Sequence, residues 1–300
     1  MTLTTTTSIR TDAGAPAQFA VAARKTRLQA RGGWRAIDLS ELWRYRELIW
    51  FLALRDIKVR YKQTVLGAAW VVIQPLFMMI VFSLFFGKLG GLQQGTPIPY
   101  PLLTFCALLP WQLFSNALNN AGNSLIVNQN LITKVYFPRL AIPLSAVLVG
   151  LLDFGISFLV LVALILWYRI RGLAPLPGWP LLTLPLFISL ALAAALAVGL
   201  WLSALSVEYR DVRYTLGFLT QFWMFITPVA YSSNIVPKHW RLLYGLNPMV
   251  GVVDGFRWCL LGQADPPGWS LLMSTMMTFA LLVGGLFYFR RMERTFADVV

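Results

Sequence analysis

Charged residues are scarce in this chain. Asp, Glu, Lys and Arg make up 12% of its 300 residues, whereas about a quarter of an ordinary soluble domain is charged. So few charges cannot solvate a globular surface of this size, and 58% of the residues are hydrophobic. The apolar residues come in long blocks rather than at the spacing of a soluble core, so a lipid bilayer is the solvent that fits.

Motifs of enzymes are missing as well. Without a G-x-x-x-x-G-K-[ST] motif, the chain is not expected to bind ATP in the P-loop manner. Without an Asp-x-Asp pair, it is a poor candidate for a metal-dependent glycosyltransferase. Its one histidine, His239, is more simply a surface residue than the base of a membrane acyltransferase. We therefore expect no catalytic residue, metal site or bound cofactor on this chain.

Cysteine is limited to Cys106 and Cys259. Two cysteines do not make a disulfide framework, so we expect two free apolar side chains, with a disulfide between them as the alternative. A signal peptide is not expected either, because the first 20 residues lack an apolar core after a basic start. Insertion is then expected to depend on the first membrane-spanning helix.

The net charge of +13 is unevenly distributed. Twelve of the 25 Lys and Arg residues lie in residues 1–62, and most others lie beside apolar blocks. Binding to nucleic acid needs a continuous basic face, so this pattern disfavours it. If both termini are cytoplasmic, 19 basic residues lie inside and six outside, as the positive-inside rule requires. Without the N-terminal region the count is seven to six, so the orientation depends on that region.

Six apolar blocks, each near the ~20 residues that cross a bilayer, predict membrane-spanning helices. They are residues 66–86, 101–118, 140–167, 181–205, 215–231 and 270–289. The predicted fold is an all-α integral membrane protein with an N-terminal interfacial helix and short re-entrant outer helices before the last span. We expect a loose cytoplasmic tail over residues 1–37, an interfacial amphipathic helix over 38–64 and the six-span domain over 65–300.

Two stretches beside the spans carry mixed patterns. Residues 38–64 place apolar side chains on one helical face and basic side chains on another, which is typical of a helix in the membrane interface. Residues 232–269 are too apolar for a plain loop. In that stretch Asn247 and Pro248 fit an N-cap and an N1 proline, and Asp254 and Arg257 form an i,i+3 pair. The pattern predicts two short helices that dip into the outer leaflet and return.

Asp153 is the one clear charge inside a predicted span. An ionised carboxylate there costs on the order of 3 kcal/mol or more, so it faces protein or is neutral. We favour a hydrogen bond to a neighbouring helix; a proton or substrate contact is the alternative. Proton-coupled transporters generally carry more than one such group, so transport powered by this chain alone is not expected.

Two inner segments have patterns that suit a protein partner. Residues 123–139 alternate asparagines with Leu and Ile, which predicts a short amphipathic helix parallel to the membrane. Residues 208–213 carry nearly balanced charges, which fits either a docking surface or a solvated turn. A third set, of interior aromatics, fits either a sugar path or helix packing: Trp111, Phe114, Phe222, Trp223 and Phe225.

Five motifs occur in the order of a known family. They are RDIKVRYKQTVLGAAW followed by QPL (residues 55–76), KVYFPR (134–139), YRDV (209–212), TPVAY (227–231) and NPM (247–249). Over residues 40–295 the chain resembles ABC-2-type permeases, and more narrowly those that export lipid-linked polysaccharides such as O-antigen, capsule and teichoic acid. Residues 1–33 lie outside the resemblance.

The resemblance implies a homodimer in the bacterial inner membrane, each protomer docking one cytoplasmic ATPase subunit that holds ATP and Mg. It implies a coupling helix over residues 123–134, an outer gate over 232–269, and substrate uptake beside the interfacial helix. The residues matched to ATPase coupling are Asn123, Asn128, Asn130, Lys134, Glu208, Arg210 and Asp211. Those matched to the outer gate are Asn247, Pro248, Asp254 and Arg257. Those matched to substrate uptake are Arg55, Lys58, Arg60, Tyr61 and Lys62.

The basic residues near the first span suggest a hypothesis of their own. Arg55, Lys58, Arg60 and Lys62 could attract the pyrophosphate of a polyprenyl-linked glycan. The rival functions are an ABC-2 exporter of drugs or lipids, a membrane enzyme of envelope polysaccharide synthesis and a self-powered secondary transporter.

Overall fold

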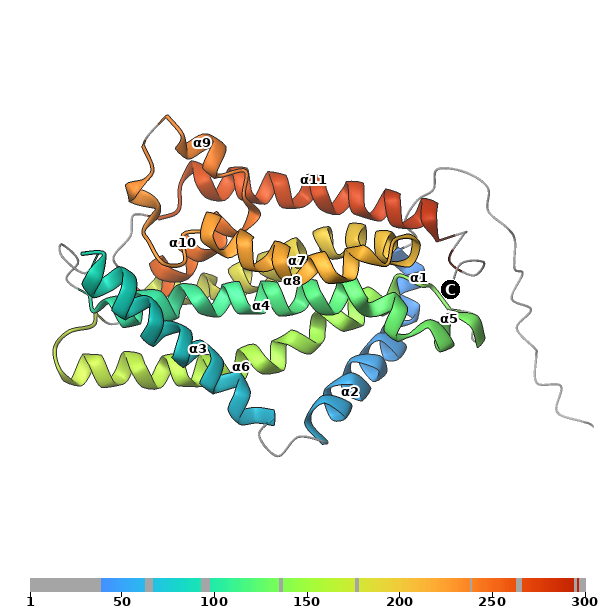
Figure 1. Ribbon diagram of the computed structural model, residues 1–300, viewed down its shortest axis with the longest axis horizontal. Helices are drawn as coiled ribbons and strands as arrows, with labels where there is room; N and C mark the ends of the chain where they lie inside the picture. The colour runs from blue at the N-terminus through green and yellow to red at the C-terminus, as the bar shows by residue number, and fades with distance from the viewer. Residues whose placement is uncertain are drawn as a thin grey trace, which may run out of the picture. The chain divides into compact units, whose positions relative to one another are not determined.

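The computed structural model describes residues 39–62, 67–92, 98–134, 137–175, 178–237, 239–262, 266–293 and 296. The predicted tail over residues 1–37, together with residue 38 and residues 63–64 of the predicted interfacial helix, lies outside these ranges. Every regular element in the described ranges is a helix (Figure 1).

Five stretches are long and apolar enough to cross a membrane: Ala69–Leu89, Tyr100–Val127, Ala141–Ile170, Trp179–Glu208 and Trp269–Met292. They contain the helices α3 (Gly67–Phe82), α4 (Tyr100–Val127), α6 (Ala141–Ile170), α7 (Leu184–Glu208) and α11 (Trp269–Met292). They match the first four predicted spans and the last, and they make the chain a multi-pass membrane protein. The first ends in a π-helical turn, Ser83–Leu89, and the fourth begins with the 3₁₀ turn Trp179–Thr183.

The fifth predicted span corresponds to α8 (Asp211–Ile226), which has 16 residues. At 1.5 Å per residue it is about 24 Å long, shorter than the ~30 Å hydrocarbon core. The backbone leaves the helix at Thr227, whose φ and ψ are −92° and 145°. The count of six spans therefore stays a prediction.

Helix α4 is the central helix of the bundle. In its most apolar window 72% of the residues are buried, against 11% for the first span and 17% for α11. It packs against α3, α6, α7, α8 and the short α10 (Pro248–Leu261). Figure 1 shows α4, α6, α7 and α11 running side by side, with α3 crossing at an angle. The outer faces of α3 and α11 are thus left for lipid or another chain.

Small residues let α7 approach α4 closely. Ala191, Ala194, Ala195 and Ala197 are completely buried on α7. A Cβ placed on Gly199 would lie 2.7 Å from the Cβ of Ala121 on α4. Close backbone approach at small residues is the usual way membrane helices gain packing energy, because lipid supplies no hydrophobic drive.

The predicted interfacial helix is broken into α1 (Leu39–Arg44) and α2 (Arg46–Lys62). Ile49, Leu52 and Ala53 are buried, and α2 packs against α6. The prediction of one continuous helix was wrong, because a turn at Tyr45 separates α1 from α2. Of the six residues predicted to share an apolar face, Val59 is exposed, whereas the other five are buried or partly buried: Leu42, Tyr45, Leu48, Ile49 and Leu52. Trp50 and Val59 are each more than 60% exposed, since only the side of α2 that meets α6 is covered.

The predicted helix over residues 123–139 also has different bounds. Residues 123–127 belong to α4, and α5 holds only Gln129–Lys134. Asn128 separates them with φ −106° and ψ 22°, while its Nδ2 donates to the Ser124 carbonyl at 3.0 Å. Leu125 is completely buried, which keeps this end of α4 in the core rather than at the membrane surface.

The outer stretch contains the predicted short helices. They are α9 (Arg241–Tyr244) and α10, preceded by the 3₁₀ turn Ser233–Ile235. Asn247 caps α10 as predicted: its side chain accepts from the Met249 N–H, and Pro248 begins the helix. Helix α10 packs against α4, α7 and α11, so it lies within the helical core.

Candidate functional site

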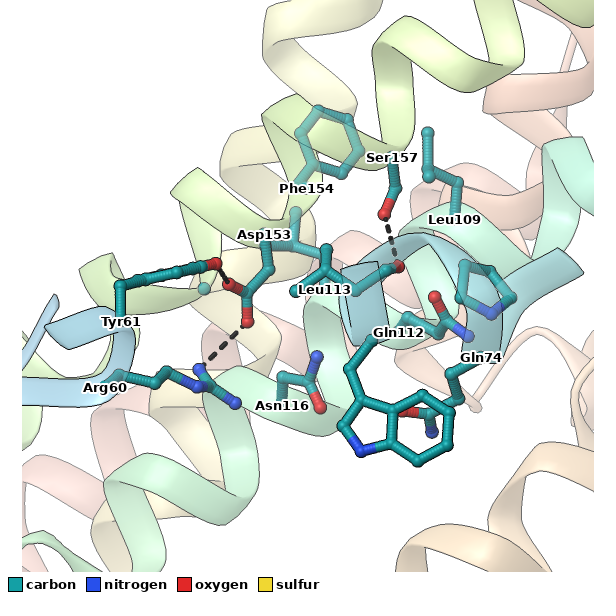
Figure 2. Close-up of a pocket in the computed structure, with 14 residues that line it drawn as sticks. Arg60, Tyr61, Gln74, Leu109, Gln112, Leu113, Asn116, Asp153, Phe154 and Ser157 are labelled. Carbon is teal, nitrogen blue, oxygen red and sulfur yellow. Dashed lines mark hydrogen bonds and ion pairs between the residues drawn. The ribbon is translucent and has the colours of Figure 1, made fainter. Parts of the chain in front are cut away.

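A polar pocket lies between α2, α3, α4 and α6, with a volume of about 210 Å³ (Figure 2). Its polar lining consists of Arg60, Tyr61, Gln74, Gln112, Asn116, Asp153 and Ser157. The name "polar pocket" below refers to these residues. Trp70, Pro75, Leu113 and Phe154 contribute apolar and aromatic walls.

Asp153 lies at one wall of the polar pocket, and its side chain is 7% exposed. Arg60 forms an ion pair with it at 2.9 Å from Nη1 to Oδ2, and the Tyr61 hydroxyl donates to Oδ1 (Figure 2). The favoured prediction, a hydrogen bond from Asp153 to a neighbouring helix, is confirmed. Burial, and then the bond to Asp153, raises the pKa of the Tyr61 hydroxyl, so it remains a donor at neutral pH.

The other walls follow from local sequence. Gln112 and Asn116 stand four residues apart on α4, so they share one helical face. Ser157, one turn beyond Asp153 on α6, donates to the Val71 carbonyl of α3 at 3.1 Å. Asp153 and Ser157 thus fix α2 and α3 to α6, and the amides of α4 face the space between them (Figure 2).

The other basic residues of α2 point elsewhere. Arg55 donates to Asp56 Oδ1 and, through Nη2, to Asn128 Oδ1 at 2.6 Å. Lys58 and Lys62 are exposed and line a separate hollow of about 380 Å³ along α2. Of the five residues matched to substrate uptake, two therefore reach the polar pocket and one contacts a residue matched to ATPase coupling.

The remaining residues matched to coupling lie at the ends of helices. Asn123 donates to the Asn119 carbonyl at 3.0 Å within α4. The other five are exposed: Asn130 and Lys134 on α5, and Glu208, Arg210 and Asp211 where α7 passes into α8. Their exposure is compatible with a docking surface and with a solvated turn.

The predicted aromatic set divides into two groups. Trp111 and Phe114 are 3% and 0% exposed, and Phe114 packs edge-on against Trp223 with ring centroids 5.3 Å apart. Phe222 and Phe225 are instead more than half exposed on α8. Helix packing accounts for the first group, and only the second is open to a path along the outside of the helix bundle.

A second polar region holds the start of α10. Asn247 Oδ1 accepts from Trp223 Nε1 at 3.0 Å, and its Nδ2 donates to Thr227 Oγ1 at 3.0 Å. Arg257 donates to the carbonyls of Val229 and Tyr231 at 3.0 and 2.9 Å. We call Trp223, Thr227, Asn247 and Arg257 the outer polar cluster. Asp254 and Arg257 attract each other along α10, as their i,i+3 spacing predicts, but no close ion pair joins them among the described contacts, and the hydrogen bonds of the guanidinium go to the two carbonyls.

Sequence analysis missed Gln74, Gln112 and Asn116 as site residues. The signal was present, because amides inside an apolar span are costly unless they meet protein or water. The i,i+4 spacing of Gln112 and Asn116 placed two of them on one face. The sequence pattern did not indicate that this face of α4 meets α2, α3 and α6.

Comparisons with known proteins agree with the membrane architecture. The model of the ABC-2 type transporter family matches residues 47–261. An O-antigen export system permease protein (RfbA) of Myxococcus xanthus is 29% identical over 262 residues, which cover 87% of this chain and 98% of the relative. A Klebsiella pneumoniae protein of the same name is 28% identical over 258 residues, 85% of this chain and 95% of the relative. The polysialic acid transport protein KpsM of Escherichia coli is 23% identical over 248 residues, 81% of this chain and 92% of the relative.

Proposed function

The chain belongs to the ABC-2 type transporter family, and from that premise we propose that it is the permease subunit of an exporter of lipid-linked polysaccharide. It is a transport subunit rather than an enzyme, and the family implies an ABC transporter with an ATPase partner. The observation that carries the proposal is near full-length similarity to permeases named for O-antigen export and polysialic acid transport.

The physics of the cargo supports this function. A polysaccharide cannot cross hydrocarbon unaided, because each hydroxyl would lose its hydrogen bonds to water. A path beside a multi-helix bundle with polar and aromatic surfaces lowers that cost. The exposed aromatic face of α8, with Phe222 and Phe225 more than half exposed, would line the path where two protomers meet.

Energy would come from a cytoplasmic ATPase subunit that binds ATP and Mg, two copies per permease dimer. Both termini of the permease would lie in the cytoplasm of a bacterium whose inner membrane holds the complex. The exposed α5 and the turn over Glu208, Arg210 and Asp211 offer surfaces to dock it.

One contact supports transmission from that docking surface to the substrate side. Arg55 of α2 donates to Asn128, at the junction of α4 and α5, over 2.6 Å. A displacement of α5 would therefore pull on α2, which carries Arg60 and Tyr61 into the polar pocket. The same basic helix would attract the pyrophosphate of the lipid carrier.

Co-purification tests the proposal. The full chain, co-expressed with an ABC ATPase subunit of its host, should purify as a complex with two copies of each subunit. Its ATP hydrolysis should rise when lipid-linked glycan from the host is added. A complex stimulated by drugs or phospholipids but not by glycan would favour the rival ABC-2 exporter, and an active ATP-independent monomer would contradict both.

A further inference from the structure

Three amides of the polar pocket have unused hydrogen-bonding capacity. Within the described part of the chain, no side-chain hydrogen bond engages Gln74, Gln112 or Asn116. Two other asparagines of α4 behave differently: Asn119 and Asn123 donate to the carbonyls four residues earlier, at 2.8 and 3.0 Å. Gln112 and Asn116 therefore differ from these two asparagines of the same helix.

The unused capacity continues one turn further along α4. Asn120 stands four residues after Asn116, and its Nδ2 is buried with no hydrogen-bond partner in the described ranges. Buried amides are costly unless water or a ligand engages them. Asn116 lies eleven residues before Val127, the last residue of α4, which is about 16 Å at 1.5 Å per residue. The amides of α4 thus lie within the candidate span Tyr100–Val127 and not at its end.

The charges in the pocket are already balanced. Arg60 is paired with Asp153, and the Tyr61 hydroxyl donates to the same carboxylate. The Ser157 hydroxyl is committed to the Val71 carbonyl. What remains is a set of neutral amides, each with donors and an acceptor. Such a set matches vicinal hydroxyls, which also donate and accept, better than it matches a phosphate, which only accepts.

The remaining wall and the size of the pocket narrow the ligand class. Trp70 lines the pocket and is 63% exposed, so its indole offers a flat surface to an incoming group. A volume of about 210 Å³ is below the ~300 Å³ at which drug-sized sites begin. One ring fits this space, and an oligosaccharide does not.

We propose that the polar pocket binds a single neutral sugar ring through Gln74, Gln112 and Asn116, with Trp70 as its stacking wall. This rests on the proposed export of glycan and adds a recognition site to it. The pocket holds one sugar of the lipid-linked chain within the protomer. The basic surface of Lys58 and Lys62 lies outside the pocket, where the phosphates of the carrier remain accessible to it.

The first test uses leucine in place of the amides. In reconstituted permease–ATPase complex, Gln112→Leu with Asn116→Leu should raise the concentration of host lipid-linked glycan that half-activates ATP hydrolysis at least tenfold. The matched control is Asn119→Leu, which removes an amide of the same helix that is already bonded, and it should stay within twofold of the unaltered complex.

A second measurement does not depend on the leucine variant folding. Gln112→Cys in the same complex should react with a water-soluble maleimide, because residue 112 lines the pocket. Cys106 and Cys259 are buried and should not react. Lipid-linked glycan should slow this labelling at least fivefold. Polyprenyl pyrophosphate, which is the lipid carrier without sugar, should not slow it. Equal protection by both would overturn the sugar site in favour of a carrier site. No labelling, or no protection by either, would overturn the pocket as a binding site.

The outcomes separate this inference from the function on which it rests. If the unaltered complex shows no response to glycan, the proposed function fails. If it responds normally and the double leucine variant responds equally well, the export function stands and the sugar site is rejected.

Discussion

The polar pocket and the outer polar cluster have similar residues and opposite hydrogen-bonding states. In the outer cluster Asn247 uses both ends of its amide, on Trp223, Thr227 and the Met249 N–H. In the pocket the amides of Gln112 and Asn116 use neither end within the described structure. An amide whose bonds are all internal fixes one conformation, whereas a free amide in a pocket is available to a ligand.

This difference assigns the two regions different tasks. The outer polar cluster holds α8, the chain after it and the start of α10 together, so its task is structural. The polar pocket holds α2 and α3 to α6 through Asp153 and Ser157, and leaves the face of α4 open. Four substitutions test this contrast, each measured as the unfolding temperature of the purified chain in detergent.

Asn247→Leu should have the largest effect. It removes an N-cap worth about 1 kcal/mol and leaves Trp223 Nε1 without its acceptor, at about 1 kcal/mol or more. Thr227 Oγ1 loses the bond from Asn247, worth about 1 kcal/mol, and keeps the one it donates to the Trp223 carbonyl. We expect a loss near 3 kcal/mol, on the order of 6–12 °C. Asn247→Asp keeps the acceptor for Trp223 and Met249 and should lose less than half as much. Equal stability of the leucine variant and the unaltered chain would end the structural assignment of this cluster.

Arg257→Met should come second. Two carbonyls, of Val229 and Tyr231, would lose their donor, which costs about 1–3 kcal/mol each. Removing a buried charge returns part of that cost, so we expect a net loss of about 2 kcal/mol. Arg257→Lys keeps the positive charge but loses the planar pair of N–H groups that reaches both carbonyls. Its stability should lie between those of the unaltered chain and the methionine variant. A methionine variant more stable than the lysine variant would show that burial of the charge outweighs its hydrogen bonds.

Tyr61→Phe should have a smaller effect, because Asp153 keeps its ion pair with Arg60. Loss of one hydrogen bond to a carboxylate is worth about 1 kcal/mol or slightly more where the site is partly open to water. Lys62→Ala, at an exposed neighbour on α2, is the control and should change the temperature by less than one degree. If both variants melt alike, the Tyr61–Asp153 bond does not hold α2 to α6.

Gln112→Leu should have the smallest effect on stability. Like Asn247→Leu, it replaces an amide side chain by leucine, so the two variants can be compared directly. Because no internal hydrogen bond is lost, we expect a change within about 0.5 kcal/mol. A loss as large as that of Asn247→Leu would show that the pocket amide is structural, and the contrast between the two regions would collapse.

Much of the helical scaffold was predictable from the sequence. Blocks of about 20 apolar residues can only be helices in a bilayer, so the spans over residues 101–118 and 270–289 were found within a few residues of their ends, except that α4 continues to Val127. The cap at Asn247 was also predicted, because Asn followed by Pro is a local signal. The fifth predicted span, over residues 215–231, was not settled, since Thr227 leaves the helix early and α8 is short.

The candidate site was predictable only in part. Asp153 stood out because a lone carboxylate in a span demands a partner, but nothing local identified Arg60 and Tyr61 as that partner, 92 or more residues away. The aromatic set was predicted as one group, yet Trp111 is buried and Phe222 is exposed. In a uniformly apolar span the sequence pattern does not tell the face toward protein from the face toward lipid.

The sequence by itself therefore determined that the chain lies in a bilayer and that its spans are helices. It also determined that each polar group inside a span needs a hydrogen-bonding partner. Tertiary structure decided which of those groups were satisfied from within. Asn247 finds Trp223 and Thr227 because α8 and α10 meet there. Gln112 and Asn116 find no protein partner in the described ranges, because α2, α3 and α6 bond to one another around them. Hydrogen bonds are short and directional, so only the packing of helices distant in sequence could separate a closed polar cluster from an open one.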